Sequence, residues 1–101
     1  MEVLLIHRLK GLVMPEMMKA SLDIAKGIQC NPGQVVPGGK CVSTYAARGK
    51  SMVVCVWDMP NLEAGMPLLE KMMMLGWDTE VIPVEKMETA LPKLEKAIAE
   101  M

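Results

Sequence analysis

Hydrophobic positions are densest between residues 41 and 59, CVSTYAARGKSMVVCVWDM, where two apolar runs flank a short polar stretch. Gly49-Lys50 lies between the runs and has the glycine-first composition of a two-residue type II′ turn. The pattern therefore predicts a β-hairpin. Its predicted cross-strand pairs are Ala47–Met52, Tyr45–Val54, Ser43–Val56 and Cys41–Asp58.

The second strand of this hairpin is apolar on both faces, which is typical of a strand that is covered on both sides. One face carries Met52, Val54 and Val56, and the other carries Thr44, Cys55 and Trp57. We expect the first set to pack on helices. The second set combines apolar bulk with polar tips, which indicates a lined cavity or a subunit interface. A slip of one residue in the register would exchange the two faces.

Five further elements follow from the periodicity of the chain: strands at 2–9 and 77–84, and helices at about 15–26, 62–75 and 87–100. The first helix is predicted to end at Gly27, and the last to be capped by Thr89. The predicted packing stripes are Met14, Met18, Leu22 together with Ser21, Ala25 and Ile28 in the first helix, and Leu91, Leu94, Ala97 and Ile98 in the last. Residues 29–40 form an unusually long connection, rich in Pro and Gly.

The order β-α-β-β-α-β-α predicts a single α+β domain over residues 1–101. We expect a ferredoxin-like fold, in which a four-stranded antiparallel sheet has helices on one face. The open face is expected to carry Val53, Cys55, Trp57, Ile82 and Val84. Such a face is too apolar to leave in contact with water. A second copy, packed sheet against sheet in a two-fold dimer, would cover it.

Composition excludes several classes of function. A formal net charge of −1 over 101 residues does not indicate the basic surface that binds nucleic acid or an anionic membrane. The apolar run within the first ten residues is too short, and charged residues follow it too early, for a membrane span or a secretory signal. We therefore expect a cytoplasmic protein with reduced thiols. Cysteines at 30, 41 and 55 match no zinc or iron–sulfur spacing, and we expect neither a metal nor another cofactor. With 12 Met and no Phe, methionine takes over core packing.

The segments STYAARGKSMVVCVWDMPNLEA and LGWDTEVIPV resemble the dimeric α+β-barrel superfamily. At the level of fold the resemblance covers about the whole chain. The chain is similar to small bacterial and archaeal domains of that superfamily, and more distantly to antibiotic-biosynthesis monooxygenase-like, muconolactone-isomerase-like and stress-responsive barrel proteins. The resemblance implies a homodimer or higher oligomer whose sheets enclose a pocket for a small, mostly apolar ligand. Relatives often place an acidic side chain near the position of Trp57, where this chain has an indole.

Candidate chemistry centres on His7, which is the only histidine. As a general base His7 would need an orienting partner, and Glu80, on the strand expected to lie beside the first, is the candidate. The alternative is a hydrogen-bonded structural histidine. We expect Thr44, Cys55 and Trp57 to line the ligand site.

Several functions remain open at this point. The first is a homodimer that binds a small apolar or aromatic molecule between the sheet and the partner subunit. The second is a cofactor-independent monooxygenase or isomerase of the dimeric-barrel type. The third is a structural module whose apolar sheet face serves only to oligomerise. A redox or copper-handling protein would need exposed thiols or thioethers.

Overall fold

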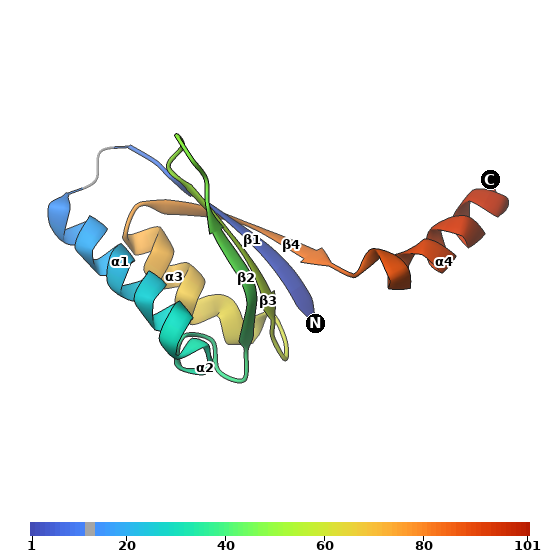
Figure 1. Cartoon of the computed structure of the whole chain (residues 1–101), viewed down its shortest axis with the longest axis horizontal. Helices are drawn as coiled ribbons and strands as arrows, with labels where there is room; N and C mark the ends of the chain where they lie inside the picture. Colours follow the sequence, from blue (N-terminus) through green and yellow to red (C-terminus); the bar gives the residue numbers. More distant parts are fainter. Residues whose placement is uncertain (12–13) are drawn as a thin grey trace.

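A computed structural model describes residues 1–11 and 14–101 of the chain. The strands are β1 (Glu2–Leu9), β2 (Lys40–Ala46), β3 (Met52–Asp58) and β4 (Trp77–Val84). The helices are α1 (Pro15–Cys30), α2 (Pro32–Val35), a short 3₁₀ helix η1 (Glu63–Gly65), α3 (Met66–Met74) and α4 (Met87–Ala99). The strands form one antiparallel sheet in the order β2-β3-β1-β4, and α1 and α3 cover one of its faces (Figure 1). The predicted α+β, ferredoxin-like fold is confirmed.

Strand β1 lies in the middle of the sheet and organises the core. Its side chains alternate, so that Val3, Leu5 and His7 are fully buried under α1 and α3 while their neighbours are half-buried or exposed. Strand β3 pairs with one edge of β1 and β4 with the other. Because β1 lies between two strands, its inward residues meet inward residues from both neighbours, and these make up the floor of the core.

The hairpin register follows the prediction at Tyr45–Val54 and Ser43–Val56. It departs from the prediction at Cys41, which lies opposite Trp57 rather than Asp58. A β-bulge between Cys41 and Ser43 shifts the register there, because the bulge inserts one extra residue into one strand of the pair. Cys41 therefore lies on the same face of the sheet as Trp57.

The two faces of the hairpin are the reverse of those predicted. Cys55 and Trp57, 1% and 0% exposed, belong to the core between the sheet and the helices. Val54 and Val56 lie on the open face, opposite Ile6 and Leu4 of β1. The expectation that Met52, Val54 and Val56 pack on helices is wrong, and so is the placing of Val53, Cys55 and Trp57 on the open face. Alternation shows which residues share a face, but the pairing of Cys55 with Leu5 decides which face meets the helices.

The open face is nevertheless apolar, as expected. Its centre consists of half-buried aliphatic side chains from three strands, and its edges carry charged residues. The aliphatic residues are Leu4, Ile6, Val54, Val56, Ile82 and Val84. The placing of Ile82 and Val84 on this face is confirmed.

Helix α1 runs four residues past the predicted end at Lys26. Gly27 does not stop it, since Gly27 lies inside the helix and does not adopt the positive φ of a helix-ending glycine. It lies against the Val35 side chain of α2, where an added Cβ would sit 3.4 Å from Val35 Cγ2. The helix ends before Asn31-Pro32. The predicted packing stripe is wrong except at Ser21 and Ile28, since Met14, Met18 and Leu22 are 62%, 45% and 54% exposed. The inward side chains of α1 are those of Met17, Ser21, Ile24 and Ile28.

The start of the helical segment after β3 follows the sequence closely. Asn61 Oδ1 accepts a hydrogen bond from the Ala64 backbone nitrogen at 2.9 Å and so satisfies a donor at the start of this segment. Pro67 lies in the first turn of α3, where a missing N–H costs nothing. Gly76 has a φ of 91°, which favours glycine, and connects α3 to β4.

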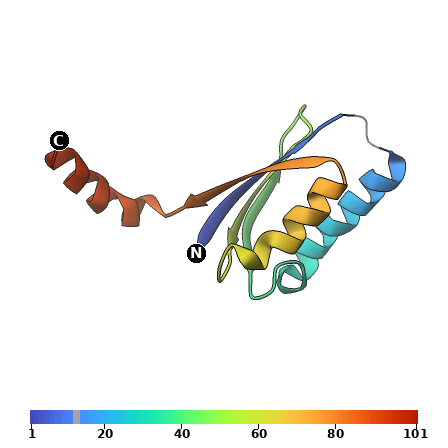
Figure 2. The ribbon, with the colours of Figure 1, turned by 180° about the vertical axis from the view of Figure 1, so that it is seen from behind.

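Helix α4 leaves the rest of the molecule altogether (Figures 1 and 2). None of its residues is buried, and the predicted stripe has no partner within the described part of its own chain. Thr89 is not the cap, because the helix begins at Met87 with Lys86 in the N-cap position, and Pro92 lies inside the helix. Within the described ranges, no helix combines the length and the hydropathy that crossing a bilayer requires.

Gly39, just before β2, packs too closely on Val36 to accept a side chain. A Cβ on Gly39 would lie 2.7 Å from Val36 Cγ1 and 3.1 Å from the Val36 carbonyl oxygen. We expect Gly39→Ala to lower the free energy of unfolding by about 1–3 kcal/mol, because core overpacking costs this much. Gly33→Ala is the matched control, since no atom lies within 4 Å of its Cβ. Urea denaturation of both variants checks the difference, and equal losses would contradict it.

Candidate functional site

A pocket of about 120 Å³ lies between the sheet and the two covering helices. His7 of β1, Thr44 of β2 and Cys55 of β3 line it from the sheet. Its apolar walls come from both helices and from the start of β4: Ile24, Ala25, Ile28, Leu68, Met72 and Trp77. Three of the five predicted site residues therefore meet in one pocket, but on the helix side of the sheet rather than on the side available to a partner subunit.

His7 is 2% exposed, and its imidazole makes one side-chain hydrogen bond. His7 Nδ1 lies 2.7 Å from Thr79 Oγ1, on the neighbouring strand. Burial disfavours the imidazolium and lowers the pKa of His7 to about 4. His7 is therefore uncharged near pH 7. Thr79 was not among the predicted site residues, although it lies directly opposite His7 in the pairing of β1 with β4.

The prediction that Glu80 orients His7 is wrong. Glu80 lies opposite Ile6, so its side chain emerges on the open face of the sheet. There its Oε1 forms an exposed ion pair with Arg8 Nη1 at 3.1 Å. An exposed pair of this kind contributes little to stability. Glu80 therefore lies outside the pocket.

Cys55 is buried beside Thr44, and the two side chains are joined by a hydrogen bond of 3.4 Å between Sγ and Oγ1. Burial raises the pKa of the Cys55 thiol, and the Thr44 hydroxyl opposes only part of that rise. The Trp57 indole N–H acts in the same direction as Thr44. Since the thiolate is the nucleophilic form, a thiol with a raised pKa is a polarizable wall of the pocket rather than a nucleophile.

Trp57 does not line the pocket. Its side chain is fully buried in the core, packed among the inward residues of the sheet and the helices. No described residue accepts a hydrogen bond of normal geometry from its Nε1. An unsatisfied buried donor costs free energy, so the packing of the indole must outweigh that cost.

Trp77 and Ser21 were not predicted as site residues, and they fix the far wall of the pocket. Trp77 Nε1 donates to Ser21 Oγ at 3.0 Å, and Ser21 Oγ donates to the Met17 carbonyl oxygen at 2.8 Å. This chain of bonds ties β4 to α1 across the pocket. Its only signal in the sequence is a serine among the apolar residues of the helix, which periodicity alone does not interpret.

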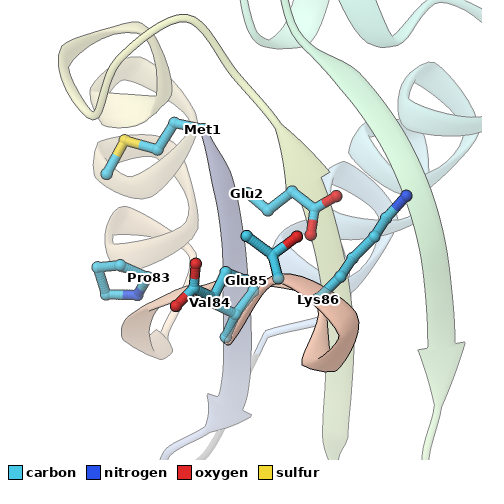
Figure 3. A pocket seen from close by; sticks show the side chains of 7 residues that line it. Met1, Glu2, Pro83, Val84, Glu85 and Lys86 are labelled. Carbon is cyan, nitrogen blue, oxygen red and sulfur yellow. The ribbon is translucent and has the colours of Figure 1, made fainter. Parts of the chain in front are cut away.

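A second hollow of about 650 Å³ lies at the base of α4 (Figure 3). It is formed by the start of β1, the end of β4 and the first residues of α4, including Glu2, Val84 and Lys86. Most of its lining side chains are exposed, so the hollow is a recess open to water rather than an enclosed site. Despite its volume, it lacks the enclosed apolar walls expected of a small-molecule pocket.

Metal ligands and thiols are scattered over the described part of the chain. Within residues 1–11 and 14–101, no three His, Cys, Asp or Glu side chains come close enough together to hold a metal ion. Cys30 is exposed, Cys41 is half-buried and Cys55 is buried, and all three are free. Burial is the main cause that raises the pKa of Cys41, and the charge of the nearby Cys55 adds to it.

Solved structures include chains of the same fold. Rv0793 from Mycobacterium tuberculosis superposes with a TM-score of 0.50 at 14% identity, over 85% of this chain and 98% of that chain. An antibiotic biosynthesis monooxygenase gives 0.48 at 13% identity, over 85% and 98%. Protein Atu4242 from Agrobacterium tumefaciens gives 0.43 at 14%, over 85% and 95%. No family model and no curated protein matches the sequence. The likeness to Rv0793, at 14% identity, shows the fold alone, and the predicted resemblance in fold is confirmed.

Proposed function

We propose that the protein binds a small, neutral, apolar or aromatic molecule in the pocket between the sheet and α1 and α3. The observation that carries this proposal is an apolar pocket into which uncharged polar groups converge from the sheet. An apolar cavity of about 150 Å³ in another protein is known to bind benzene. A volume of about 120 Å³ therefore selects a ligand of about one ring.

The electrostatics of the pocket favour a neutral ligand. His7 is uncharged near pH 7 because its pKa is lowered to about 4, and burial keeps Cys55 as a thiol. A charged ligand would lose its hydration there without gaining a partner of opposite charge. Thr44 and His7 are polar groups through which the pocket would orient a ligand that carries a single hydroxyl or carbonyl.

Ligand binding is tested by fluorescence, because Trp77 lines the pocket and Trp57 does not. Phenol and benzaldehyde serve as neutral one-ring probes, and benzoate as the charged counterpart. We expect saturable quenching by the neutral probes. Ala25→Leu adds bulk to an exposed position on the pocket wall and should weaken binding at least about tenfold.

Lys19→Leu adds the same side chain to an exposed position of α1 that does not line the pocket. This control variant should bind the probes as the wild type does. Equal binding by wild type and Ala25→Leu, or no quenching by any probe, would refute the proposed site.

Binding is proposed in preference to catalysis because of the state of His7. Cofactor-independent monooxygenase or isomerase chemistry would use His7 as the base that takes a proton from the substrate. A base is most effective when its pKa lies near the working pH. With a pKa of about 4, His7 is a weak base, and its partner is the neutral Thr79 rather than a carboxylate.

The open face of the sheet supports a second part of the proposal, a homodimer. Six half-buried aliphatic side chains form a contiguous apolar surface there, on the side of the sheet opposite α1 and α3. Surfaces of this kind mark interaction sites. A second copy would cover the face through a two-fold interface. The pocket lies within one subunit, so the homodimer and the ligand site are separate proposals.

A further inference from the structure

Helix α4 carries an apolar stripe that no residue of 1–11 or 14–101 covers. Met87, Leu91, Leu94 and Ile98 follow one another at spacings of four, three and four residues, which places them on one side of the helix. Their side chains are 65%, 47%, 47% and 68% exposed. The charged residues Lys93, Lys96 and Glu100 occupy the opposite side. An amphipathic helix of this kind gains most of its stability by packing its apolar side.

The course of α4 points away from its own sheet (Figures 1 and 2). Glu85 and Lys86 link it to β4, and local contacts hold the linker and the first turn of the helix together. Lys93 Nζ forms an ion pair with Glu85 Oε2 at 2.9 Å, and the Lys86 carbonyl accepts hydrogen bonds from Thr89 N and Ala90 N, both at 2.9 Å. To cover its own open face, α4 would have to reverse direction at this linker.

The open face of a second copy matches α4 in size and polarity. A helix of 13 residues is about 20 Å long, and four strands about 4.8 Å apart make a sheet about 15–19 Å wide. The helix thus spans the sheet once. The aliphatic centre of the open face would meet the stripe, while the charged side of α4 would remain in water.

The recess at the base of α4 provides room for such a contact (Figure 3). It lies between the end of the open face, at Glu2 and Val84, and the first residues of the arm, at Lys86 and Thr89. In a dimer with a two-fold axis, a segment of each copy would occupy the recess of the other copy. The same surface would then be used by both, as an isologous interface requires.

We infer that α4 is an exchange arm, whose apolar stripe docks on the open sheet face of a second copy of this chain. The inference rests on the proposed homodimer and is independent of the ligand, since no residue of α4 lines the pocket. Each subunit gives one arm and receives one. The arm thereby supplies a helical layer on the side of the sheet that α1 and α3 leave open.

Sedimentation equilibrium of two matched variants tests the arm. Leu94→Glu places a charge in the stripe, and Lys96→Gln changes the net charge by the same amount on the opposite side. We expect the wild type and Lys96→Gln to be dimers of similar affinity. Leu94→Glu should raise the dissociation constant at least about tenfold, because each arm loses a leucine that the dimer interface would bury.

The outcomes separate the arm from the homodimer. If Leu94→Glu dimerises as tightly as the wild type, the homodimer stands and the exchange arm is refuted. If the wild type is a monomer, both are refuted.

Cross-linking identifies the surface that the arm touches. Ala97→Cys, beside the stripe, carries a benzophenone in a Cys30→Ser/Cys41→Ser background and is refolded together with nitrogen-15-labelled protein. We expect cross-links to peptides of residues 2–9 or 52–58 in the labelled copy. Cross-links found only within the unlabelled chain would show that α4 folds back on its own sheet, and would overturn the inference. The same label at Lys96→Cys, on the opposite side, should give neither product.

Discussion

Trp57→Ala is expected to lower the free energy of unfolding by about 3–5 kcal/mol, the usual cost of removing a buried aromatic side chain. Trp57 is 0% exposed and is among the largest side chains that are fully buried in this core. It belongs to a core cluster that includes residues of the sheet and of α1 and α3. A cavity at that position cannot collapse without moving the sheet against the helices. Urea denaturation followed by far-ultraviolet circular dichroism measures the loss.

Two further variants serve as comparisons for the stability of Trp57→Ala. Leu22→Ala removes an apolar side chain from the outward side of α1, where it is 54% exposed, and should change stability by no more than about 0.5 kcal/mol. Trp57→Phe should cost less than Trp57→Ala, because it retains a ring and removes an Nε1 donor that makes no hydrogen bond of normal geometry. A loss at Leu22 as large as that at Trp57 would mean that the core lies elsewhere.

Acidification is expected to destabilise the protein through His7. Its pKa is about 4 in the folded state, against an ordinary value of 6.5. Between these two values the unfolded chain binds the proton and the folded chain does not, so stability falls as the pH falls. The contribution of His7 is complete above pH 6.5 and is lost as the pH falls to about 4. The full difference corresponds to about 3 kcal/mol, at about 1.36 kcal/mol for each pKa unit.

Urea titrations at several pH values between 4 and 7 measure this slope. His7→Gln offers a neutral side chain that can still bond to Thr79 Oγ1, and it does not titrate. We expect its stability to depend much less on pH in the same window. An equally steep dependence in His7→Gln would assign the effect to other groups and would remove the basis for an uncharged pocket.

The sequence predicts the strands well because their signal is local. The hairpin of β2 and β3, the apolar run of β1 and the proline-marked edge strand β4 each have boundaries written into a few neighbouring residues. The bulge at Cys41 does not, since one extra residue in a strand leaves the alternation intact on either side of it. The predicted pair Cys41–Asp58 failed for that reason.

Which side of the sheet the helices cover depends on long-range contacts. His7, Thr44 and Cys55 meet in one pocket because they share a face. The sequence alone predicts a lined cavity or a subunit interface on the side away from the helices, because β3 is apolar on both sides. The sequence offers Glu80 as the partner of His7 because it does not give the register between β1 and β4. That register places Thr79 opposite His7 and turns Glu80 to the other face.

The packing stripe of α1 failed for a different reason. Methionines at 14, 17 and 18 are apolar on neighbouring sides of the helix, so two stripes fit the sequence equally well. The structure buries the side of Ser21 and Ile28, where Ser21 accepts the hydrogen bond of Trp77. A polar member of the predicted stripe thus lies inward, while its apolar members Met18 and Leu22 are exposed.

The central position of β1 has a consequence for folding during synthesis. Strand β1 pairs with β3 and β4, whose residues 52–58 and 77–84 are synthesised after it. Until β4 has emerged, β1 exposes a row of apolar side chains and an unpaired edge. Long-range pairing of this kind slows folding and exposes the nascent chain to aggregation. The sheet can therefore close only after β4 has been synthesised.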